Sequence, residues 1–474
     1  MLGSFLGTGF PGASRLRRVG RLVRLGAETL VRTVVHKVRR LLAPPGRREK
    51  LDDDHRQQTM GHVVDTVGEM KGLAMKVGQQ ASYMLSPVTP DPVAEQLARL
   101  QQDAPPMDSS AAGRVVERAL GRPASVVFAE WNPIPIAAAS IGQVHRAVTH
   151  DGEVVAVKVQ YPGAEDALRA DIDNVGVLGK ITVRRSQGPE PKPPREASDG
   201  GERQTVATPG VDPLSMDALL EQFKARLIQE TDYVREAANQ ELIGSAFRDD
   251  PLIHVPRVYR HLSTRTVLTT ELANGARFSE LLAWDQDQRD LAGQTLFRFH
   301  HEALFRVGHH NADPHPGNYI FGGDGRVTFL DFGALWDVAP EFLEGAPRLL
   351  EVLEAAEVET SDTPADPAEF AKISRQGGTS TPSPMASLGW FYDQLVVAGR
   401  RPLPQPLESL LATMSGGRTF KFATAADEAF VGEMARHIGQ SANALLGVQA
   451  VLATLGARCD WAAIGRKVLA ASGS

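Results

Sequence analysis

Cysteine is nearly absent from this chain of 474 residues, which contains only Cys459. A single thiol rules out a disulfide within the chain and argues against a cysteine-based zinc site, and it is compatible with a reducing compartment. Long apolar runs are also missing, because the longest stretch, 442–457, is interrupted by glycine and polar residues. A membrane-spanning helix needs about 20 apolar residues, so we expect none here.

Basic and acidic residues are separated along the chain. Residues 1–50 hold twelve Arg or Lys and two acidic residues, a net charge of +10, so the remaining residues carry −16. Apolar residues recur at helical spacing within 15–42, which predicts a basic amphipathic helix. An anionic membrane surface and the acidic remainder of the protein fit such a helix equally well. Because a transit peptide has the same composition, we expect a cytoplasmic protein with peripheral membrane contact, or a mitochondrial one.

The most informative stretch runs over 309–333. Two short apolar runs flank a turn of glycine and aspartate at 322–325, which predicts a β-hairpin. The hairpin would place Asn318 at one base and Asp331, the first residue of Asp-Phe-Gly, at the other. Asp313 would lie on the loop that precedes the hairpin.

These three polar residues suit phosphoryl transfer. Mg²⁺ takes a few hard oxygen ligands and keeps several waters, so the Asn318 amide and the Asp331 carboxylate are the candidate metal ligands. Asp313 is then left to orient or deprotonate a nucleophile. Protein kinases show the same Asp-to-Asn spacing and the same Asp-Phe-Gly. The alternative, a hairpin beside an unrelated Asp-Phe-Gly, does not explain the Asp/Asn pair upstream.

Residues 123–160 switch to strand patterning, in the order strand, tight loop, strand, turn, strand. The last strand carries Val-Ala-Val-Lys, the pattern in which a kinase lysine holds the α- and β-phosphates, so Lys158 is the candidate phosphate ligand. The alternative is a lysine whose aliphatic stem lies along a buried strand. The tight loop has alanines where a phosphate loop has glycines, and their Cβ atoms should stiffen it. Its nucleotide-binding candidates are Ala137, Ala138, Ala139 and Ser140.

A polar segment and a long helix follow. Residues 187–213 are rich in Pro, Gly, Glu, Ser and Thr, which is typical of a linker or a disordered insertion. A helix is predicted over 214–243, and a kinase fold needs a helix glutamate to pair with Lys158. Glu230 and Glu236 are both candidates, and because they lie six residues apart they do not share a face. The sequence leaves the choice between them open.

Two strands, at 255–258 and 266–271, lead into a connector between a small β-rich lobe and a helical lobe. Glu271 and Leu272 begin this connector, and their backbone groups would contact the adenine in a kinase-like fold. A helix over 287–308 then leads into the catalytic stretch.

Two histidine pairs, His300-His301 and His309-His310, raise the question of a metal site. Adjacent side chains on a helix point in different directions, so we interpret these histidines as structural. The chain after the catalytic stretch is mostly helical, with a polar break at 360–384. It lacks the Ala-Pro-Glu signature of the kinase activation segment, which argues against an ordinary platform for protein substrates.

A helix predicted over 56–85 contains Lys-Val-Gly-Gln, in which Lys76 and Gln79 share one face. Taken alone, these two side chains are typical of a solvated surface. The motif is nevertheless the first of several that occur together in one known family.

The chain resembles the UbiB/aarF family of atypical, protein-kinase-like proteins over about residues 15–340. Lys-x-Gly-Gln is peculiar to that family and changes the interpretation of Lys76 from surface to functional. The other matching motifs are the Ala-rich loop at 137–140, Val-Ala-Val-Lys at 155–158, Glu-Thr-Asp at 230–232 with Glu236, Asp-to-Asn at 313–318 and Asp-Phe-Gly at 331–333.

The resemblance implies an α+β, bilobal protein-kinase-like fold with an N-terminal helical extension over the active site. Lys76 and Gln79 would reach the region of Glu230 and Asp232, gate the site and block a protein substrate. Members of the family bind ATP with Mg²⁺ and behave as ATPases or lipid-linked kinases. Many support the synthesis of coenzyme Q or another isoprenoid quinone at a membrane.

We therefore expect a Mg²⁺/ATP-dependent kinase or ATPase that acts on a lipid or isoprenoid-quinone precursor. Its expected protein partners are quinone-biosynthesis enzymes, and we do not expect it to bind nucleic acid. Lys158 would bind phosphates, Glu236 would position it and Asp313 would act as the base. Two alternatives stay open: a small-molecule phosphotransferase of the aminoglycoside-kinase type, and a nucleotide-binding pseudokinase scaffold. The expected domains are a basic segment at 1–50, an extension at 51–120, an N-lobe at 121–272 and a C-lobe at 273–474.

Overall fold

The computed structural model describes residues 107, 109–139, 141–166, 228–229, 231–311, 313–360, 386–404 and 418–472. Several predictions lie outside the described residues. They are the helices at 15–42 and 56–85, the insertion at 187–213, all but the first residue of the polar break at 360–384, and the side chains of Lys76, Gln79, Ser140 and Glu230.

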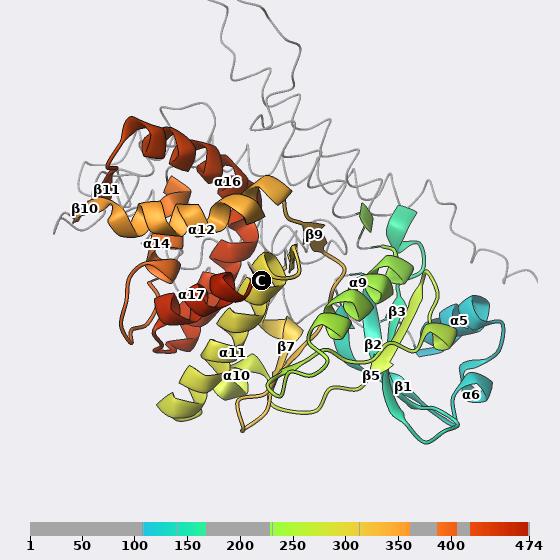
Figure 1. Cartoon of the computed structure of the whole chain (residues 1–474). Helices are drawn as coiled ribbons and strands as arrows, with labels where there is room; N and C mark the ends of the chain where they lie inside the picture. The colour runs from blue at the N-terminus through green and yellow to red at the C-terminus, as the bar shows by residue number, and fades with distance from the viewer. Residues whose placement is uncertain are drawn as a thin grey trace, which may run out of the picture.

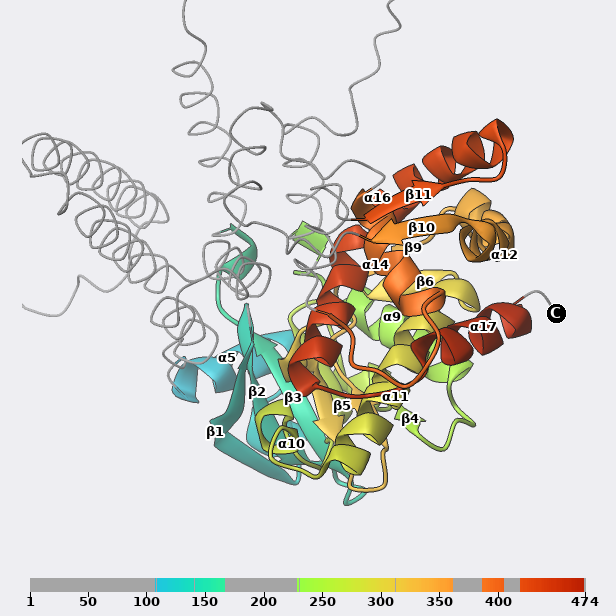
Figure 2. The same cartoon turned by 90° about the vertical axis from the view of Figure 1, so that its left-hand side faces the viewer.

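The smaller lobe is built on a four-stranded antiparallel sheet in the order β1-β2-β3-β5 (Figures 1 and 2). Its strands are β1 (Glu130–Ala139), β2 (Gly142–Val148), β3 (Val154–Gln160) and β5 (Val267–Glu271). Helix α5 (Ser109–Leu120) and the short α6 (Ala124–Val127) share a buried apolar cluster with the valines of β3. Helix α9 (Tyr233–Ala246) packs on the opposite face, where Tyr233 and Ala237 meet Leu268.

The alternation of β3 decides which way the candidate lysine points. Val155, Val157 and Val159 are fully buried on the face that α5 covers. Because successive side chains of a strand point to opposite faces, Lys158 faces α9 instead. Its partner across the sheet, Leu268, belongs to the cluster with α9. The short valine pattern of this strand therefore positions the site lysine.

The larger lobe is organised around α11 (Gln286–Phe305), which has twelve buried residues and lies between a β-hairpin and a layer of helices (Figure 1). The hairpin pairs β7 (Tyr319–Phe321) with β8 (Val327–Phe329), and β4 (Ile253–His254) adds to β8 in parallel. A second small pair joins β6 (His309–Asn311) to β9 (Leu335–Asp337). The short elements around them are α10 (Phe278–Leu281), η2 (Arg260–Leu262) and η3 (Pro316–Asn318).

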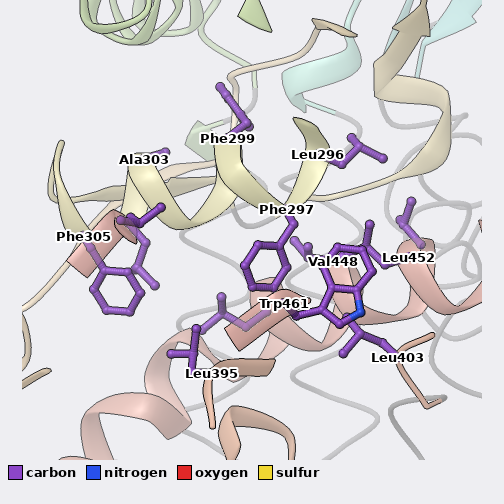
Figure 3. Close-up of a cluster of buried hydrophobic side chains, with 14 of the residues drawn as sticks. Leu296, Phe297, Phe299, Ala303, Phe305, Leu395, Leu403, Val448, Leu452 and Trp461 are labelled. Carbon is purple, nitrogen blue, oxygen red and sulfur yellow. The ribbon is translucent and has the colours of Figure 1, made fainter. Parts of the chain in front are cut away.

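Aromatic residues on two sides of α11 join the hairpin to the C-terminal helices. Figure 3 shows Phe297 pointing toward Trp461, and their ring centroids are 5.1 Å apart. Phe299 points the other way, and its ring stacks on Phe329 of β8 at 3.6 Å. The surrounding helices are α12 (Pro340–Ala355), α14 (Ala386–Leu395), α16 (Ala425–Leu455) and α17 (Trp461–Ser472). Among the described residues, no helix combines the length and apolar character needed to cross a bilayer.

This architecture confirms the predicted α+β arrangement of a β-rich small lobe and a helical large lobe. The predicted hairpin is also confirmed, with Tyr319 opposite Phe329 and Phe321 opposite Val327. One further strand pair in the C-terminal part was not predicted. It joins β10 (Glu357–Thr360) to β11 (Arg418–Lys421).

Two local predictions in the small lobe are wrong. The strand pattern predicted from residue 123 starts only at Glu130, because a helical turn, α6, begins after Pro123, whose carbonyl accepts hydrogen bonds from Val126 N and Val127 N. The alanines at 137–139 are not a loop, because Ala137, Ala138 and Ala139 pair with Val144, Gln143 and Gly142 and continue β1 to the end of the hairpin.

Two predictions around α9 are also wrong. The helix predicted over 214–243 lies outside the described residues at 214–227, and it does not continue through Asp232, which has extended backbone angles and caps α9 by accepting from Val234 N. The strand at 255–258 reduces to one isolated bridge between Val258 and Thr270. Capping by aspartate competes with a continuous helix, which explains the first error.

Candidate active site

Three charged side chains from separate elements meet between the lobes. The Lys158 Nζ atom donates to both carboxylate oxygens of Glu236, at 2.8 and 3.0 Å, and to Asp331 Oδ2 at 3.2 Å. Burial alone would lower the pKa of Lys158, but the negative charges of Asp331 and Glu236 outweigh it and hold that pKa well above its ordinary value. Lys158 is therefore a stable cation, and Glu236 is the glutamate that pairs with it.

The surroundings of Lys158 include residues that no sequence motif indicated. The Tyr233 ring is fully buried, and the Lys158 Nζ atom lies 5.1 Å from its centroid, within cation–π distance. Gln160, two residues after the lysine, donates to the carbonyl of Thr231 at 3.0 Å and anchors the turn before α9. The helical spacing of Tyr233 and Glu236 was the one available signal, since residues three apart share a face.

The catalytic-loop candidates are joined by side-chain amides. The backbone N–H of Asp313 donates to Asn311 Oδ1 at 2.9 Å, and Asn318 Nδ2 donates to the Asp313 carbonyl at 3.0 Å. Leu330 N donates to the Asn318 carbonyl at 2.8 Å, so the two bases of the hairpin lie side by side. The structure thus brings Asp313, Asn318 and Asp331 together, as the hairpin predicts.

Asp331 has an uncommon backbone conformation. Among the described residues it is the only one other than glycine with a positive φ, at 60°. Its Oδ1 accepts from Gly333 N at 3.2 Å, and its carbonyl accepts from Asn311 Nδ2 at 2.9 Å. A left-handed residue with a Cβ costs about 1–3 kcal/mol, and it persists where the surroundings determine it.

The oxygen atoms at the hairpin bases fit a divalent cation. The amide nitrogen of Asn318 is bound to Asp313, so its side-chain oxygen is the atom that remains for a ligand role. The Asp331 side chain is 32% exposed, and a carboxylate has about four lone-pair sites on its two oxygens. One amide oxygen and one carboxylate, completed by water and phosphate oxygens, match the ligand preference of Mg²⁺.

The two histidines of α11 are buried and make hydrogen bonds within the larger lobe. His300 Nε2 lies 2.9 Å from the Tyr319 hydroxyl, and His301 Nδ1 lies 2.8 Å from the Phe297 carbonyl. Burial lowers the pKa of His300 to about 3 and that of His301 to about 4, so both rings are neutral. Burial and the nearby charge of Asp313 raise the pKa of Tyr319 well above its ordinary value.

The predicted adenine-contact residues lie at the junction of the lobes. Glu271 N donates to the Arg257 carbonyl at 2.9 Å and Leu272 N donates to the Val154 carbonyl at 3.3 Å. Their N–H groups are therefore used within the protein, and the Leu272 carbonyl accepts from Asn274 Nδ2 at 3.5 Å. The Glu271 side chain contacts His254 Nε2 at 3.1 Å. The adenine role of both residues stays a prediction.

The remaining candidates are placed in part. Ala137 and Ala138 are exposed on β1, and Ala139 is half-buried. Asp232 caps α9 and lies 3.5 Å from Arg265 Nη1. Its predicted gating partners lie outside the described residues.

Comparisons with known proteins place this site in a family. The sequence profile described as the ABC1 atypical kinase-like domain matches residues 99–357. "Protein ACTIVITY OF BC1 COMPLEX KINASE 8, chloroplastic" of Arabidopsis thaliana is 36% identical over 276 residues, covering 57% of this chain and 33% of that protein. "Atypical kinase COQ8B, mitochondrial" of Rattus norvegicus is 31% identical over 295 residues, covering 62% of this chain and 51% of that protein. The chain thus spans about a third to a half of the length of these relatives.

A solved structure supports the same placement. The complex of Rv3197 with erythromycin from Mycobacterium tuberculosis superposes with a TM-score of 0.50 and 26% identity, covering 89% of this chain and 98% of that chain. The family match and this likeness confirm the protein-kinase-like fold and the resemblance on which the sequence expectations rested.

Proposed function

Because the chain belongs to the ABC1 atypical kinase-like family, we propose that it binds ATP with Mg²⁺ and catalyses ATP-dependent phosphoryl transfer or hydrolysis. The observation that carries this proposal is the ion-paired contact of Lys158 with Glu236 and Asp331. A lysine held by a helix glutamate beside the Asp-Phe-Gly aspartate is the arrangement on which kinase catalysis depends. When bound, the nucleotide would supply the transferable phosphoryl group, and Mg²⁺ would supply the cationic charge that neutralises it.

Each residue of the candidate site has one role in this proposal. Lys158 presents a permanent positive charge to phosphate oxygens, and Glu236 keeps its ammonium group in place. Asn318 and Asp331 offer oxygen ligands to the metal. Asp313, held by Asn311 through its backbone, accepts a proton from a hydroxyl group or orients a water.

We further propose that the substrate is a lipid, such as an isoprenoid-quinone precursor, at a membrane surface. The names of the relatives associate them with the mitochondrion and the chloroplast, and the segment 15–42 has the basic amphipathic pattern of a peripheral membrane helix. Quinone-biosynthesis enzymes are the corresponding protein partners. Lys76 and Gln79 would gate the site against protein substrates together with Glu230 and Asp232.

The test is ATP turnover by the purified chain, with and without anionic liposomes that contain a phenolic quinone-precursor mimic. We expect Asp313→Asn to lower turnover at least about a hundredfold, because a positioned base contributes that much. Asp324→Asn is the matched control, since Asp324 lies in the hairpin turn and accepts from Arg326 N. Asp324→Asn should keep wild-type turnover, and liposomes should stimulate ATP turnover by the wild-type chain and by Asp324→Asn.

The other outcomes separate the alternatives. Equal turnover in wild type and Asp313→Asn would contradict the proposed chemistry. Nucleotide binding without turnover would favour the pseudokinase scaffold, and transfer to soluble alcohols or aminoglycosides alone would favour the small-molecule phosphotransferase.

A further inference from the structure

Two consecutive peptide carbonyls of Asp331-Phe332-Gly333, the proposed metal-binding segment, each accept a hydrogen bond from an asparagine side chain. Asn311 Nδ2 donates to the Asp331 carbonyl at 2.9 Å, and Asn239 Nδ2 donates to the Phe332 carbonyl at 2.8 Å. The two asparagines come from different elements, β6 and α9. The segment is therefore fixed from both lobes through its backbone.

These hydrogen bonds act where the backbone is strained. Asp331 has its φ at 60°, and a return to an ordinary conformation would rotate the peptide groups that follow it. The carbonyls of those peptide groups are the ones that Asn311 and Asn239 hold. Each neutral hydrogen bond contributes about 0.5–1.5 kcal/mol, which is comparable to the strain of one left-handed residue.

Asn239 also lies on the helix that carries the lysine partner. Glu236 and Asn239 are three residues apart on α9, so they share a face. One residue binds Lys158, and the other binds Phe332, whose own side chain is fully buried. The contacts form a closed ring from Lys158 through α9 to Phe332 and back through Asp331.

We propose that Asn239 is a positioning residue, which ties α9 to Phe332 so that the helix and the Asp331-Phe332-Gly333 segment adopt their site geometry together. Loss of this tie would free the segment to leave the left-handed conformation. The Asp331 carboxylate would then spend less time in the position that serves a metal. The metal part of this inference rests on the proposed function, whereas the conformational part does not.

Hydrogen exchange of the nucleotide-free protein tests the conformational part. Asn239→Leu removes the donor at similar size, and Asn239→Asp keeps the shape while replacing the donor by a carboxylate. We expect peptides that cover 330–335 to exchange several-fold faster in both variants, because Gly333 N loses its fixed acceptor geometry. The aspartate variant keeps the test decisive where the leucine variant folds poorly.

Gln240→Leu is the matched control. Gln240 is the next residue of α9, is buried, and donates to the Pro256 carbonyl at 2.6 Å, outside the metal-binding segment. Its loss should reduce stability without faster exchange over 330–335. Equal acceleration by the Asn239 and Gln240 variants, or wild-type exchange in both Asn239 variants, would overturn the proposal.

A second readout addresses the metal. The Mg²⁺ concentration for half-maximal ATP turnover should rise about tenfold in Asn239→Asp, the size that the loss of one hydrogen bond allows, and should stay unchanged in Gln240→Leu. A wild-type protein that neither binds nor turns over ATP would refute the proposed function and leave the exchange comparison intact. An unchanged Mg²⁺ requirement together with faster exchange would show that Asn239 holds the segment without positioning the metal ligand, which would overturn the assigned role.

Discussion

Two aspartates, Asp331 and Asp290, illustrate how this fold uses one residue type in opposite ways. The Asp290 side chain on α11 is 9% exposed, and it accepts from Gln286 Nε2 at 2.7 Å and Arg458 N at 2.6 Å and pairs with Arg400. The Asp331 side chain is 32% exposed and accepts from Lys158 and from the Gly333 amide.

The difference lies in how completely each carboxylate is surrounded. Burial would raise the pKa of Asp290, but its hydrogen bonds, led by that from Arg458 N, hold it below the ordinary value, so the group is a permanently charged anchor between α11 and the start of α17. The Asp331 side chain is about a third exposed and sits on a strained backbone. A saturated carboxylate stabilises the fold, whereas a partly exposed one can bind a ligand.

The largest expected effect is on activity at Asp331. We expect Asp331→Asn to lower the kcat of ATP turnover about a thousandfold, because it removes the anionic metal ligand. Its midpoint of thermal unfolding should change by only a few degrees. Turnover and differential scanning calorimetry of the same preparation measure both, and a folded variant with wild-type kcat would remove Asp331 from the site.

The opposite result is expected at Asp290, where substitution should lower stability and leave kcat unchanged. Asp290→Asn removes the charge of a buried carboxylate that accepts from Gln286, Arg458 and Arg400, and it should lower the free energy of unfolding by about 1.5–3 kcal/mol. Below the midpoint of unfolding, kcat should match that of wild type. Chemical denaturation and turnover at low temperature are the measurements, and a stable variant with impaired kcat would reverse the roles assigned to the two aspartates.

Buried neutral histidines extend the comparison to pH. His301 has a pKa of about 4 in the fold and about 6.5 in the unfolded chain, so the unfolded state binds more protons between these values. The contribution of each such histidine to the free energy of unfolding is therefore fully present above about pH 6.5. It falls by about 1.4 kcal/mol per pH unit as the pH decreases below that value. His300 behaves in the same way, with a pKa of about 3.

We expect His301→Phe to reduce the slope of unfolding free energy against pH between pH 6 and 4.5 by about 1.4 kcal/mol per pH unit, the contribution of one such histidine. Urea titrations at several pH values give this slope. An unchanged slope would show that His301 is protonated in the folded protein, and Gln286→Ala, which removes a donor to Asp290, serves as a control that should keep the wild-type slope.

The smallest effect is expected at the alanine-rich end of β1. Ala138→Gly should raise nucleotide turnover or autophosphorylation a few-fold, because glycine loosens the end of β1 where it pairs with β2. Ala119→Gly on α5, away from the cleft, is the comparison for general destabilisation. Wild-type nucleotide affinity and rate in Ala138→Gly would argue against a restraining role for this alanine.

Sequence reasoning located the parts of the site that depend on short-range patterns. The hairpin brought Asn318 and Asp331 together because a two-strand turn fixes its own bases, and the alternation of β3 fixed the direction of Lys158. The choice between Glu230 and Glu236 needed the packing of α9 on the sheet. The break at Asp232 decided that packing, and a helical pattern continuing through 231–232 concealed it.

The supporting amides could not be found in this way. Asn239, Gln160 and Asn311 act by donating to backbone carbonyls that lie 93, 71 and 20 residues away in sequence. An amide on a helix or strand has many possible acceptors, and no local spacing identifies the one it meets in the fold. Their roles became visible only when the tertiary hydrogen bonds were known.

The most direct measurement is calorimetric titration of ADP into the wild-type chain, Asp290→Asn and Asp331→Asn, each with and without Mg²⁺. We predict that Mg²⁺ strengthens ADP binding at least about tenfold in wild type and Asp290→Asn, and that Asp331→Asn loses this gain while it still binds ADP alone. A gain from Mg²⁺ that is the same in all three proteins, or no binding of ADP to the wild-type chain, would contradict a metal–nucleotide site at Lys158, Asn318 and Asp331.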